Sequence, residues 1–164
     1  MVRLPEEQWR KYRKLRLEAL KTEPSAFGSS FEQELKLGEG TWQKRIRGVL
    51  FAVSGGEPVG LLSYVFDDRP KTRHIAHIYS VYVTPKYRGR GIGTMLLKRA
   101  MAEIRRNRDA AKAQLSVNPL LLPAVALYKR AGFQVVGRPR NELRVGNKFF
   151  DLLLMEKEIR RVSD

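Results

Sequence analysis

The protein has 164 residues and a mass of 18.9 kDa, which suits one domain that buries its own core. Apolar residues make up 43% and charged residues 30%, a composition that argues against both a disordered chain and a membrane protein. There is no cysteine, which excludes disulfides, thiolate metal sites and any acyl-enzyme formed on a thiol of the protein.

The formal net charge is +15, and most of the excess lies in one third of the chain. Residues 85–140 carry 13 basic and 2 acidic side chains. Such a concentration suits a polyanionic partner (nucleic acid, an anionic membrane or a phosphate-rich ligand), or else a basic solvated surface with no partner. The first residues lead into a charged stretch and no apolar run is long enough to span a bilayer, so we expect a cytoplasmic protein with no membrane contact.

The first 50 residues predict two helices. The apolar residues between Pro5 and Pro24 fall roughly on one stripe, and Pro5 followed by two glutamates suits a first helical turn. A second helical stretch is predicted from residue 29 or 30 to about 47, broken or kinked near Gly38 and Gly40.

The middle and end of the chain alternate strands and helices. Three runs of apolar and β-branched residues predict strands at 49–53, 58–66 and 74–83. An amphipathic helix follows at 92–104. The remaining predicted elements are a strand at 113–117, a helix at 119–131 that begins on Asn118 as its cap and ends on Gly132, and strands at 133–136 and 149–155. This order predicts a mixed α/β domain.

The most informative segment runs from Val81 to Thr94, where a strand ends, a loop with three alternate glycines follows, and a helix begins. Glycine allows positive φ angles and a close approach of the backbone to a ligand, and the first amides of a helix have no partner within the helix. Together they form an anion site that fits a pyrophosphate. Arg88 and Arg90 add charge, and Thr94 adds a hydroxyl group.

Two other phosphate-binding loops do not match this segment. A Walker loop needs Gly-Lys-Ser/Thr, and a dinucleotide-binding loop needs G-x-G-x-x-G with an acidic residue on the next strand. Neither is present, because the glycines run G-x-G-x-G and the following strand offers no acid. A glycine-rich turn without a ligand stays the alternative interpretation.

The motif Arg88-x-x-Gly91-x-Gly93, preceded by Val81-Tyr82-Val83-x-Pro85, resembles the acetyl-coenzyme A signature of the GNAT N-acetyltransferase superfamily. Two further stretches are similar to that family: Leu115-x-Val117-Asn118-Pro119 followed by Ala126-Leu127-Tyr128 and Gly132-Phe133, and the opening Leu15-Arg16-Leu17-x-Ala19-Leu20. The resemblance covers nearly the whole chain. It implies one N-acetyltransferase domain over 1–164, with a mixed, mostly antiparallel sheet of six to seven strands, helices on both faces, and a gap between the family's fourth and fifth strands that admits the cofactor.

The resemblance implies acetyl-coenzyme A as co-substrate and no metal. The main chain of the strand at 74–83 would bind the pantetheine and the acetyl carbonyl, and the loop amides would hold the pyrophosphate. The expected set is Val81, Tyr82, Val83, Arg88, Gly89, Arg90, Gly91, Ile92, Gly93 and Thr94. Many members have an asparagine seven residues before the tyrosine, where this chain has Leu121. The contacts of that helix with pantetheine would therefore be more apolar, or would come from Asn118.

The resemblance also implies direct transfer from a thioester to a neutral amine, which needs a base for the amine and an acid for the thiolate. Tyr128 matches the family tyrosine near the sulfur, so we assign it as the acid; a core aromatic is the alternative. His77 stands where several members place an ionisable residue, so we assign it as the base; a strand histidine that only hydrogen-bonds is the alternative. We expect no metal on His74 and His77, because residues three apart on a strand face opposite sides. Tyr79 would lie on the face of His77 and line the acceptor pocket or pass protons.

The acceptor is expected between the first two helices and the last hairpin, with Phe27, Phe31, Glu32, Glu34 and Trp42 as candidates. The two acids would attract a cationic amine or else form a solvated face. Two rival functions stay open: a sensor that binds acetyl-coenzyme A without turnover, and a nucleic-acid-binding module on the basic stretch, against which the lack of a recognition motif argues. A homodimer is a reasonable expectation.

Overall fold

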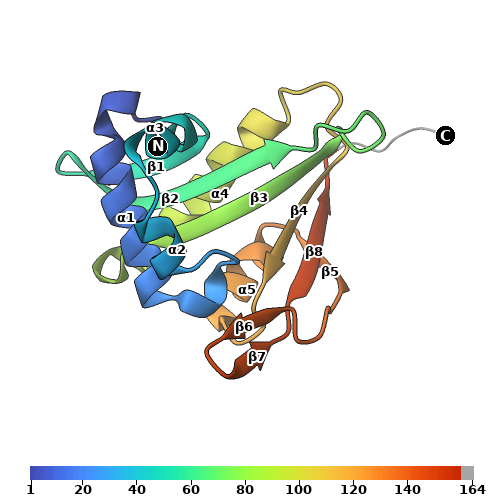
Figure 1. Ribbon diagram of the computed structural model, residues 1–164. Coiled ribbons are helices and arrows are strands. Elements are labelled where there is room, and N and C mark those ends of the chain that lie inside the picture. Colours follow the sequence, from blue (N-terminus) through green and yellow to red (C-terminus); the bar gives the residue numbers. More distant parts are fainter. Residues whose placement is uncertain (160–164) are drawn as a thin grey trace.

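The structure is a computed structural model and describes residues 1–159 (Figure 1). The helices are α1 (Trp9–Thr22), α2 (Phe31–Leu35), α3 (Glu39–Ile46), α4 (Ile92–Ile104) and α5 (Leu122–Arg130). The strands are β1 (Val49–Ser54), β2 (Glu57–Phe66), β3 (Ile75–Val83), β4 (Lys112–Val117), β5 (Gln134–Gly137), β6 (Leu143–Val145), β7 (Lys148–Phe150) and β8 (Leu153–Glu158).

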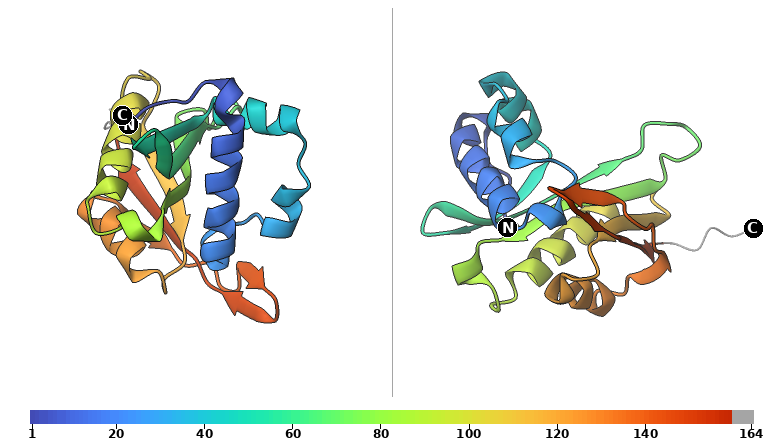
Figure 2. Two further views of the ribbon diagram at one scale, coloured as in Figure 1. Left: turned by 90° about the vertical axis from the view of Figure 1, so that its left-hand side faces the viewer. Right: turned by 60° about the horizontal axis from the view of Figure 1, so that its bottom comes forward.

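Six of these strands form one mixed sheet in the order β1-β2-β3-β4-β8-β5, and β6 pairs with β7 in a separate hairpin. Every neighbouring pair in the large sheet is antiparallel except β3 and β4, which run parallel. Figure 2 shows α1, α2 and α3 on one side of this sheet and α4 and α5 on the other. The expected fold class is confirmed.

Each face of the sheet has its own apolar core. On the α1 and α3 face, the ring of Tyr12 packs edge-on against Trp42 and Phe51, with centroids 5.4 and 5.7 Å away. On the opposite face, Leu96 of α4 and Met155 of β8 are completely buried. Trp42 is also completely buried and donates its indole N–H to the Leu37 carbonyl at 3.1 Å. The prediction that Trp42 contacts the acceptor is therefore wrong, because the ring is needed inside this core.

β3 and β4 separate along most of their length. They pair only over Ile75–His77 and Lys112–Gln114, although β3 continues to Val83 and β4 to Val117. In Figure 1 the two strands diverge from this short paired region, with α5 at the open end. This is the expected gap. No helix within residues 1–159 is both long and apolar enough to cross a bilayer.

Most predicted boundaries lie within one residue of the structure, and the larger differences concern three elements. The second helical stretch is two helices, α2 and α3, with the break at Gly38 as expected. The fifth helix begins at Leu122 rather than at 119, because the Asn118 carboxamide accepts a hydrogen bond from the Leu120 N–H at 2.9 Å and closes a turn instead of capping the helix.

The predicted last strand at 149–155 is two strands, β7 and β8. Asp151 breaks the run, since its carboxylate accepts hydrogen bonds from the Arg138 side chain and the Asn141 N–H, both at 3.0 Å. The chain therefore leaves the β6–β7 hairpin before it enters the sheet.

Candidate functional site

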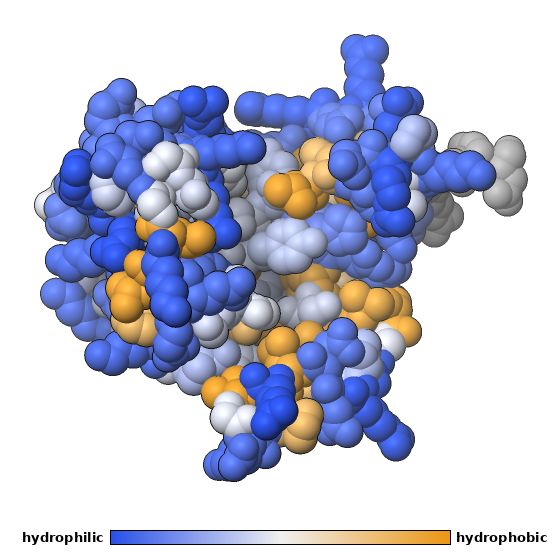
Figure 3. Space-filling view, in the orientation of Figure 1, coloured by the Kyte–Doolittle hydropathy of each residue, from blue (hydrophilic) through white to orange (hydrophobic). Residues whose placement is uncertain are grey.

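Two clefts meet at the gap between β3 and β4. The larger has a volume of about 1190 Å³ and the smaller about 620 Å³. Figure 3 shows the surface hollowed between the helices on its left side and the strands on its right. The residues that line both clefts are Ala26, Phe27, Val81, Leu121, Ala124 and Tyr128. Ligands in the two clefts would therefore touch each other at this junction.

β3 carries a bulge at the junction. Tyr79 pairs with Ser63 and Tyr82 pairs with Leu61, so two residues of β3, Ser80 and Val81, face one residue of β2. Ser80 has a φ of 57°, in the left-handed region that non-glycine residues rarely adopt. A bulge leaves the extra residue without a partner in the strand ladder. The bulge therefore interrupts the pairing of β3 with β2 beside Val81, at the junction of the two clefts.

The glycine loop forms one wall of the smaller cleft. Gly89 and Gly91 have φ angles of 74° and 75°, and a Cβ built at either would meet no atom within 4 Å. Gly91 is the N-cap of α4, so the amides of the next three residues are the free first-turn donors of a 13-residue helix. The lining includes Val81, Tyr82, Val83, Arg88, Gly89, Gly91, Ile92, Gly93 and Thr94. The open space over the glycines and the free amides together suit a phosphate group.

Three of the expected cofactor residues have side chains engaged elsewhere. The Arg88 guanidinium donates to the Val83 carbonyl and to the Glu23 carboxylate, each at 2.9 Å. The Arg90 guanidinium lies 5.2 Å from the Tyr87 ring, and Arg90 does not line either cleft. The Tyr82 hydroxyl donates to Glu18 at 2.9 Å. The side chains of Arg88 and Tyr82 therefore already have protein partners, although both residues line the smaller cleft.

Asn118 lies on the other side of the junction from the loop. It lines the larger cleft and is almost completely buried. Leu121, by contrast, reaches both clefts. The smaller cleft thus presents an apolar side chain at the position where many family members have an asparagine.

Tyr128 is buried at the point where the clefts join. Its ring packs edge-on against Phe133 at 6.2 Å, and within residues 1–159 no protein group hydrogen-bonds its hydroxyl. Burial raises the pKa of Tyr128 well above its ordinary value. The hydroxyl is protonated at neutral pH, as it would be at the ordinary pKa of a tyrosine, and can donate a hydrogen bond into the junction.

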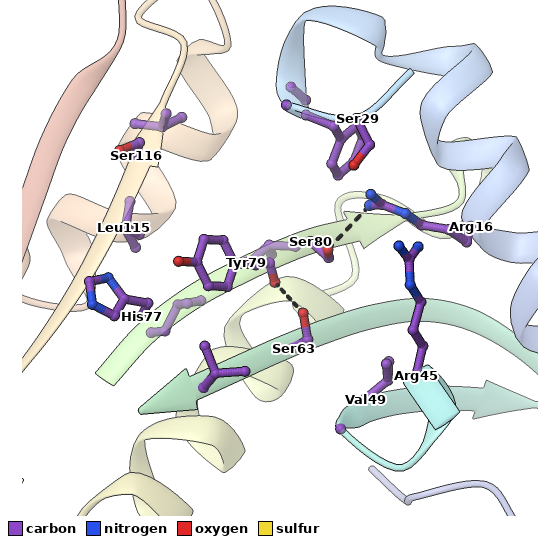
Figure 4. A pocket seen from close by; sticks show the side chains of 18 of the residues that line it. Arg16, Ser29, Arg45, Val49, Ser63, His77, Tyr79, Ser80, Leu115 and Ser116 are labelled. Atoms are coloured by element: carbon purple, nitrogen blue, oxygen red, sulfur yellow. Dashed lines mark hydrogen bonds between the residues drawn. The ribbon is translucent and has the colours of Figure 1, made fainter. Parts of the chain in front are cut away.

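His77 and Tyr79 reach the larger cleft from the same face of β3, as expected. Their rings stack with centroids 6.1 Å apart and an angle of 18° between the planes. In Figure 4 both rings point into the cleft, on the side where Leu115 and Ser116 lie. His74 lines neither cleft, and the described part of the chain contains no group of three or more His, Cys, Asp or Glu residues that could hold a metal ion.

A buried ion pair between α1 and α2 forms the opposite wall of the larger cleft. The sequence did not predict this pair, although Glu34 was a candidate for contact with the acceptor. Arg16 donates from Nε and Nη2 to the Glu34 carboxylate at 3.0 and 2.8 Å, and Arg45 approaches the same carboxylate at 3.4 Å. Burial alone would raise the pKa of Glu34, but the hydrogen bonds from Arg16 and Ser29 and the charges of Arg16 and Arg45 together lower it. One feature of the sequence could have indicated this ion pair: Arg16 is a charged residue within an apolar stripe, between Leu15 and Leu17.

Only some of the residues that were expected to contact the acceptor line a cleft. Phe27 lines both clefts and Glu34 lines the larger one, whereas Phe31 and Glu32 line neither. Leu143 of the β6–β7 hairpin also lines the larger cleft. Because the Glu34 charge is already balanced by arginine, the carboxylate is not free to attract a cationic amine.

Glu34→Gln is expected to lower the free energy of unfolding by about 3 kcal/mol, because it leaves the buried Arg16 guanidinium without a counter-charge. Urea unfolding measures the loss, and Glu32→Gln, at an exposed position on the same short helix, is the matched control with no expected effect. The folded-state pKa of Glu34 lies below its unfolded value, so its stabilising contribution is present above the unfolded pKa and is lost as the pH falls through the folded value. Glu34→Gln should consequently lose less stability than the native protein when the pH is lowered. Equal stability of Glu34→Gln and Glu32→Gln at pH 7 would contradict a stabilising role of the Arg16–Glu34 ion pair.

Known acetyltransferases are similar to this chain in sequence and in fold. A sequence profile described as "Acetyltransferase (GNAT) family" matches residues 4–133. Thialysine N-epsilon-acetyltransferase of Mus musculus is 36% identical over 80 residues, which is 49% of this chain and 46% of that protein's length. An acetyltransferase of the GNAT family from Streptococcus pneumoniae superposes with a TM-score of 0.86 at 21% identity, over 97% of this chain and 98% of that one.

The structure of YncA from Salmonella typhimurium with its cofactor acetyl-CoA superposes with a TM-score of 0.84 at 17% identity, over 99% of this chain and 95% of that one. At these identities the two structural matches show the fold alone. The family profile covers most of the chain, including the glycine loop, the bulged strand and Tyr128. This chain therefore belongs to the GNAT acetyltransferase family.

Proposed function

We propose that the protein moves an acetyl group from acetyl-coenzyme A directly to a primary amine. The observation that carries this proposal is the junction: a cleft built on free helix amides meets a second cleft at a buried, protonated tyrosine. Family membership and the fold shared with YncA, which was solved with acetyl-CoA, support the same activity.

The smaller cleft fits acetyl-coenzyme A. The space over Gly89 and Gly91 is open where a side chain would otherwise stand, so a pyrophosphate can approach the amides of residues 92–94. The main chain of Val81 and Val83 would bind the pantetheine, and Leu121 would pack against its apolar part. When bound, acetyl-coenzyme A supplies the activated thioester carbonyl.

His77 and Tyr128 would move the protons. An amine attacks through its lone pair, so the ammonium form must first lose a proton, and the neutral His77 imidazole would take it directly or through water. The Tyr128 hydroxyl, which like any tyrosine is protonated at neutral pH, would donate its proton to the departing sulfur, because it lies where the two clefts join. Tyr79, stacked on His77, would hold the imidazole in orientation.

His77→Gln is expected to lower kcat about 100-fold, at the low end for loss of a general base because water can carry part of the proton transfer. Initial rates at saturating acetyl-coenzyme A measure kcat. His74→Gln, outside both clefts, is the control and should keep the native kcat. An unchanged kcat in His77→Gln would leave His77 a strand residue that only hydrogen-bonds.

Two measurements on the purified chain test the activity itself. Acetyl-coenzyme A should raise the unfolding temperature through preferential binding to the folded state, and a nucleic acid duplex should not. A panel of amines and peptides should then release free thiol from acetyl-coenzyme A. Stabilisation without turnover of any amine would favour a sensor, and stabilisation by the duplex alone would favour a nucleic-acid-binding module.

A further inference from the structure

We infer, on the basis of the proposed acetyl transfer, that the acceptor is a primary amine that also carries a negatively charged oxyanion group such as a carboxylate or phosphonate. Among the described residues that line the larger cleft, four carry a full charge: Arg16, Glu34, Lys44 and Arg45. Three are cations and one is an anion. The larger cleft is therefore cationic, so it does not fit the alternative in which the two glutamates of α2 attract a cationic amine.

The negative charge of Glu34 does little to reduce the positive charge that a ligand in the larger cleft would meet. Both oxygens of the Glu34 carboxylate are occupied by Arg16, and one of them also lies 3.4 Å from Arg45. Glu34 is 2% exposed, so it presents almost no surface to the cleft. Two guanidinium groups thus share one carboxylate, and Lys44 adds a further positive charge from α3.

The positive charge of Arg16 and Arg45 lies close to the junction of the two clefts, where we propose that the acetyl group is transferred. Arg16 Nη1 donates to Ser80 Oγ at 3.2 Å, and Ser80 is the bulged residue next to Val81, where the clefts join. In Figure 4 the guanidinium groups of Arg16 and Arg45 approach each other in the cleft, across from His77 and Tyr79. An amine placed between His77 and the junction would therefore direct its other substituents toward these arginines.

Arg45 is the group best placed to bind the oxyanion. Its side chain is 42% exposed, whereas the Arg16 side chain is 7% exposed and committed to Glu34 and Ser80. The contact of Arg45 with Glu34 uses Nη1, and a guanidinium has five N–H donors in a fork that matches a carboxylate or a phosphonate. A second cationic group on the acceptor would be repelled by the same charges, so polyamines should be poor substrates.

Matched pairs of amines test this inference. The probes are L-methionine with L-methioninamide, 2-aminoethylphosphonate with ethanolamine, the peptide amides Met-Glu-NH₂ with Met-Gln-NH₂, and spermidine. Free-thiol release gives kcat/KM, expressed per unprotonated amine because the anionic group raises the pKa of the neighbouring amine. We expect the anionic member of at least one pair to exceed its neutral partner by about 10- to 100-fold, the range for hydrogen bonds to a charged group.

The pairs also separate the sources of the oxyanion. A preference confined to the first two pairs indicates a small amino acid or aminophosphonate, and one confined to the third indicates an acidic peptide amino terminus. Equal use of both members of every pair, or spermidine as the best acceptor, would overturn the inference while leaving acetyl transfer intact. If no amine is turned over, calorimetric titration of the same pairs in the presence of coenzyme A decides the inference: tighter binding of the anionic members supports it, and equal affinity overturns it.

Substitutions test which residues produce the preference for an anionic acceptor. Arg45→Gln and Lys44→Gln should each reduce the ratio between anionic and neutral acceptors several-fold, and Arg45→Lys should retain more of it than Arg45→Gln. The control is Lys36→Gln, which removes one positive charge from an exposed position outside both clefts and should leave the ratio unchanged. An undiminished ratio in Arg45→Gln and in Lys44→Gln would assign the preference to another part of the chain.

Discussion

Gly91→Val is expected to weaken acetyl-coenzyme A binding about 1000-fold, because the substitution costs two or more hydrogen bonds between loop amides and a charged phosphate. Gly91 has a φ of 75°, which a β-branched residue tolerates poorly, so the loop would have to rearrange. The valine side chain would also extend into the open space that the phosphate needs, since nothing of the protein lies within 4 Å of a Cβ there. Calorimetric titration with acetyl-coenzyme A measures the loss.

Gly56→Val is the matched control for this experiment. Gly56 has a φ of 79°, a Cβ there would also meet nothing within 4 Å, and the residue lies in the β1–β2 turn outside both clefts. Both variants should therefore lose similar folding stability, about 1–2 kcal/mol for a left-handed non-glycine residue. Only Gly91→Val should lose cofactor affinity. Equal affinity in the two variants would refute the assignment of the loop to the pyrophosphate.

Tyr128→Phe is expected to lower kcat about 1000-fold, within the range for loss of a positioned general acid. The affinity for acetyl-coenzyme A should change little, because the ring that packs against Phe133 and lines both clefts is retained. The folding stability should also be retained, since within residues 1–159 no protein group bonds to the hydroxyl that is removed. Single-turnover rates and calorimetric titration separate these effects.

Tyr64→Phe is the matched control for Tyr128→Phe. Tyr64 is half-buried and its hydroxyl donates to Glu103 at 3.1 Å, outside both clefts. This variant should lose some stability and keep the native kcat. If Tyr128→Phe transferred acetyl groups at the native rate, Tyr128 would be a core aromatic, and the proton for the sulfur would come from water or from another group.

The glycine loop could be predicted from sequence because its chemistry is local. A strand, alternate glycines and a helix start follow one another within 14 residues, and only glycine readily takes the φ angles seen at Gly89 and Gly91. The break between α2 and α3 could be predicted for the same reason, because it depends on Gly38, which precedes the first residue of α3. The start of α5 was misplaced because the Asn118 side chain can close either a helix cap or a turn, and both options use the same backbone amides.

The sequence by itself determined the order of most helices and strands, the strand, glycine loop and helix start at residues 81–94, and the places of His77 and Tyr128 on their elements. The tertiary structure alone decided which charges the larger cleft presents. Arg16 and Glu34 are 18 residues apart and Arg16 and Ser80 are 64 apart, so their contacts exist only after α1, α2 and β3 have packed together. The burial of Trp42 in the core was also decided by packing. An aromatic residue on an amphipathic helix can line a pocket or fill a core, and the sequence alone does not show which residues surround it.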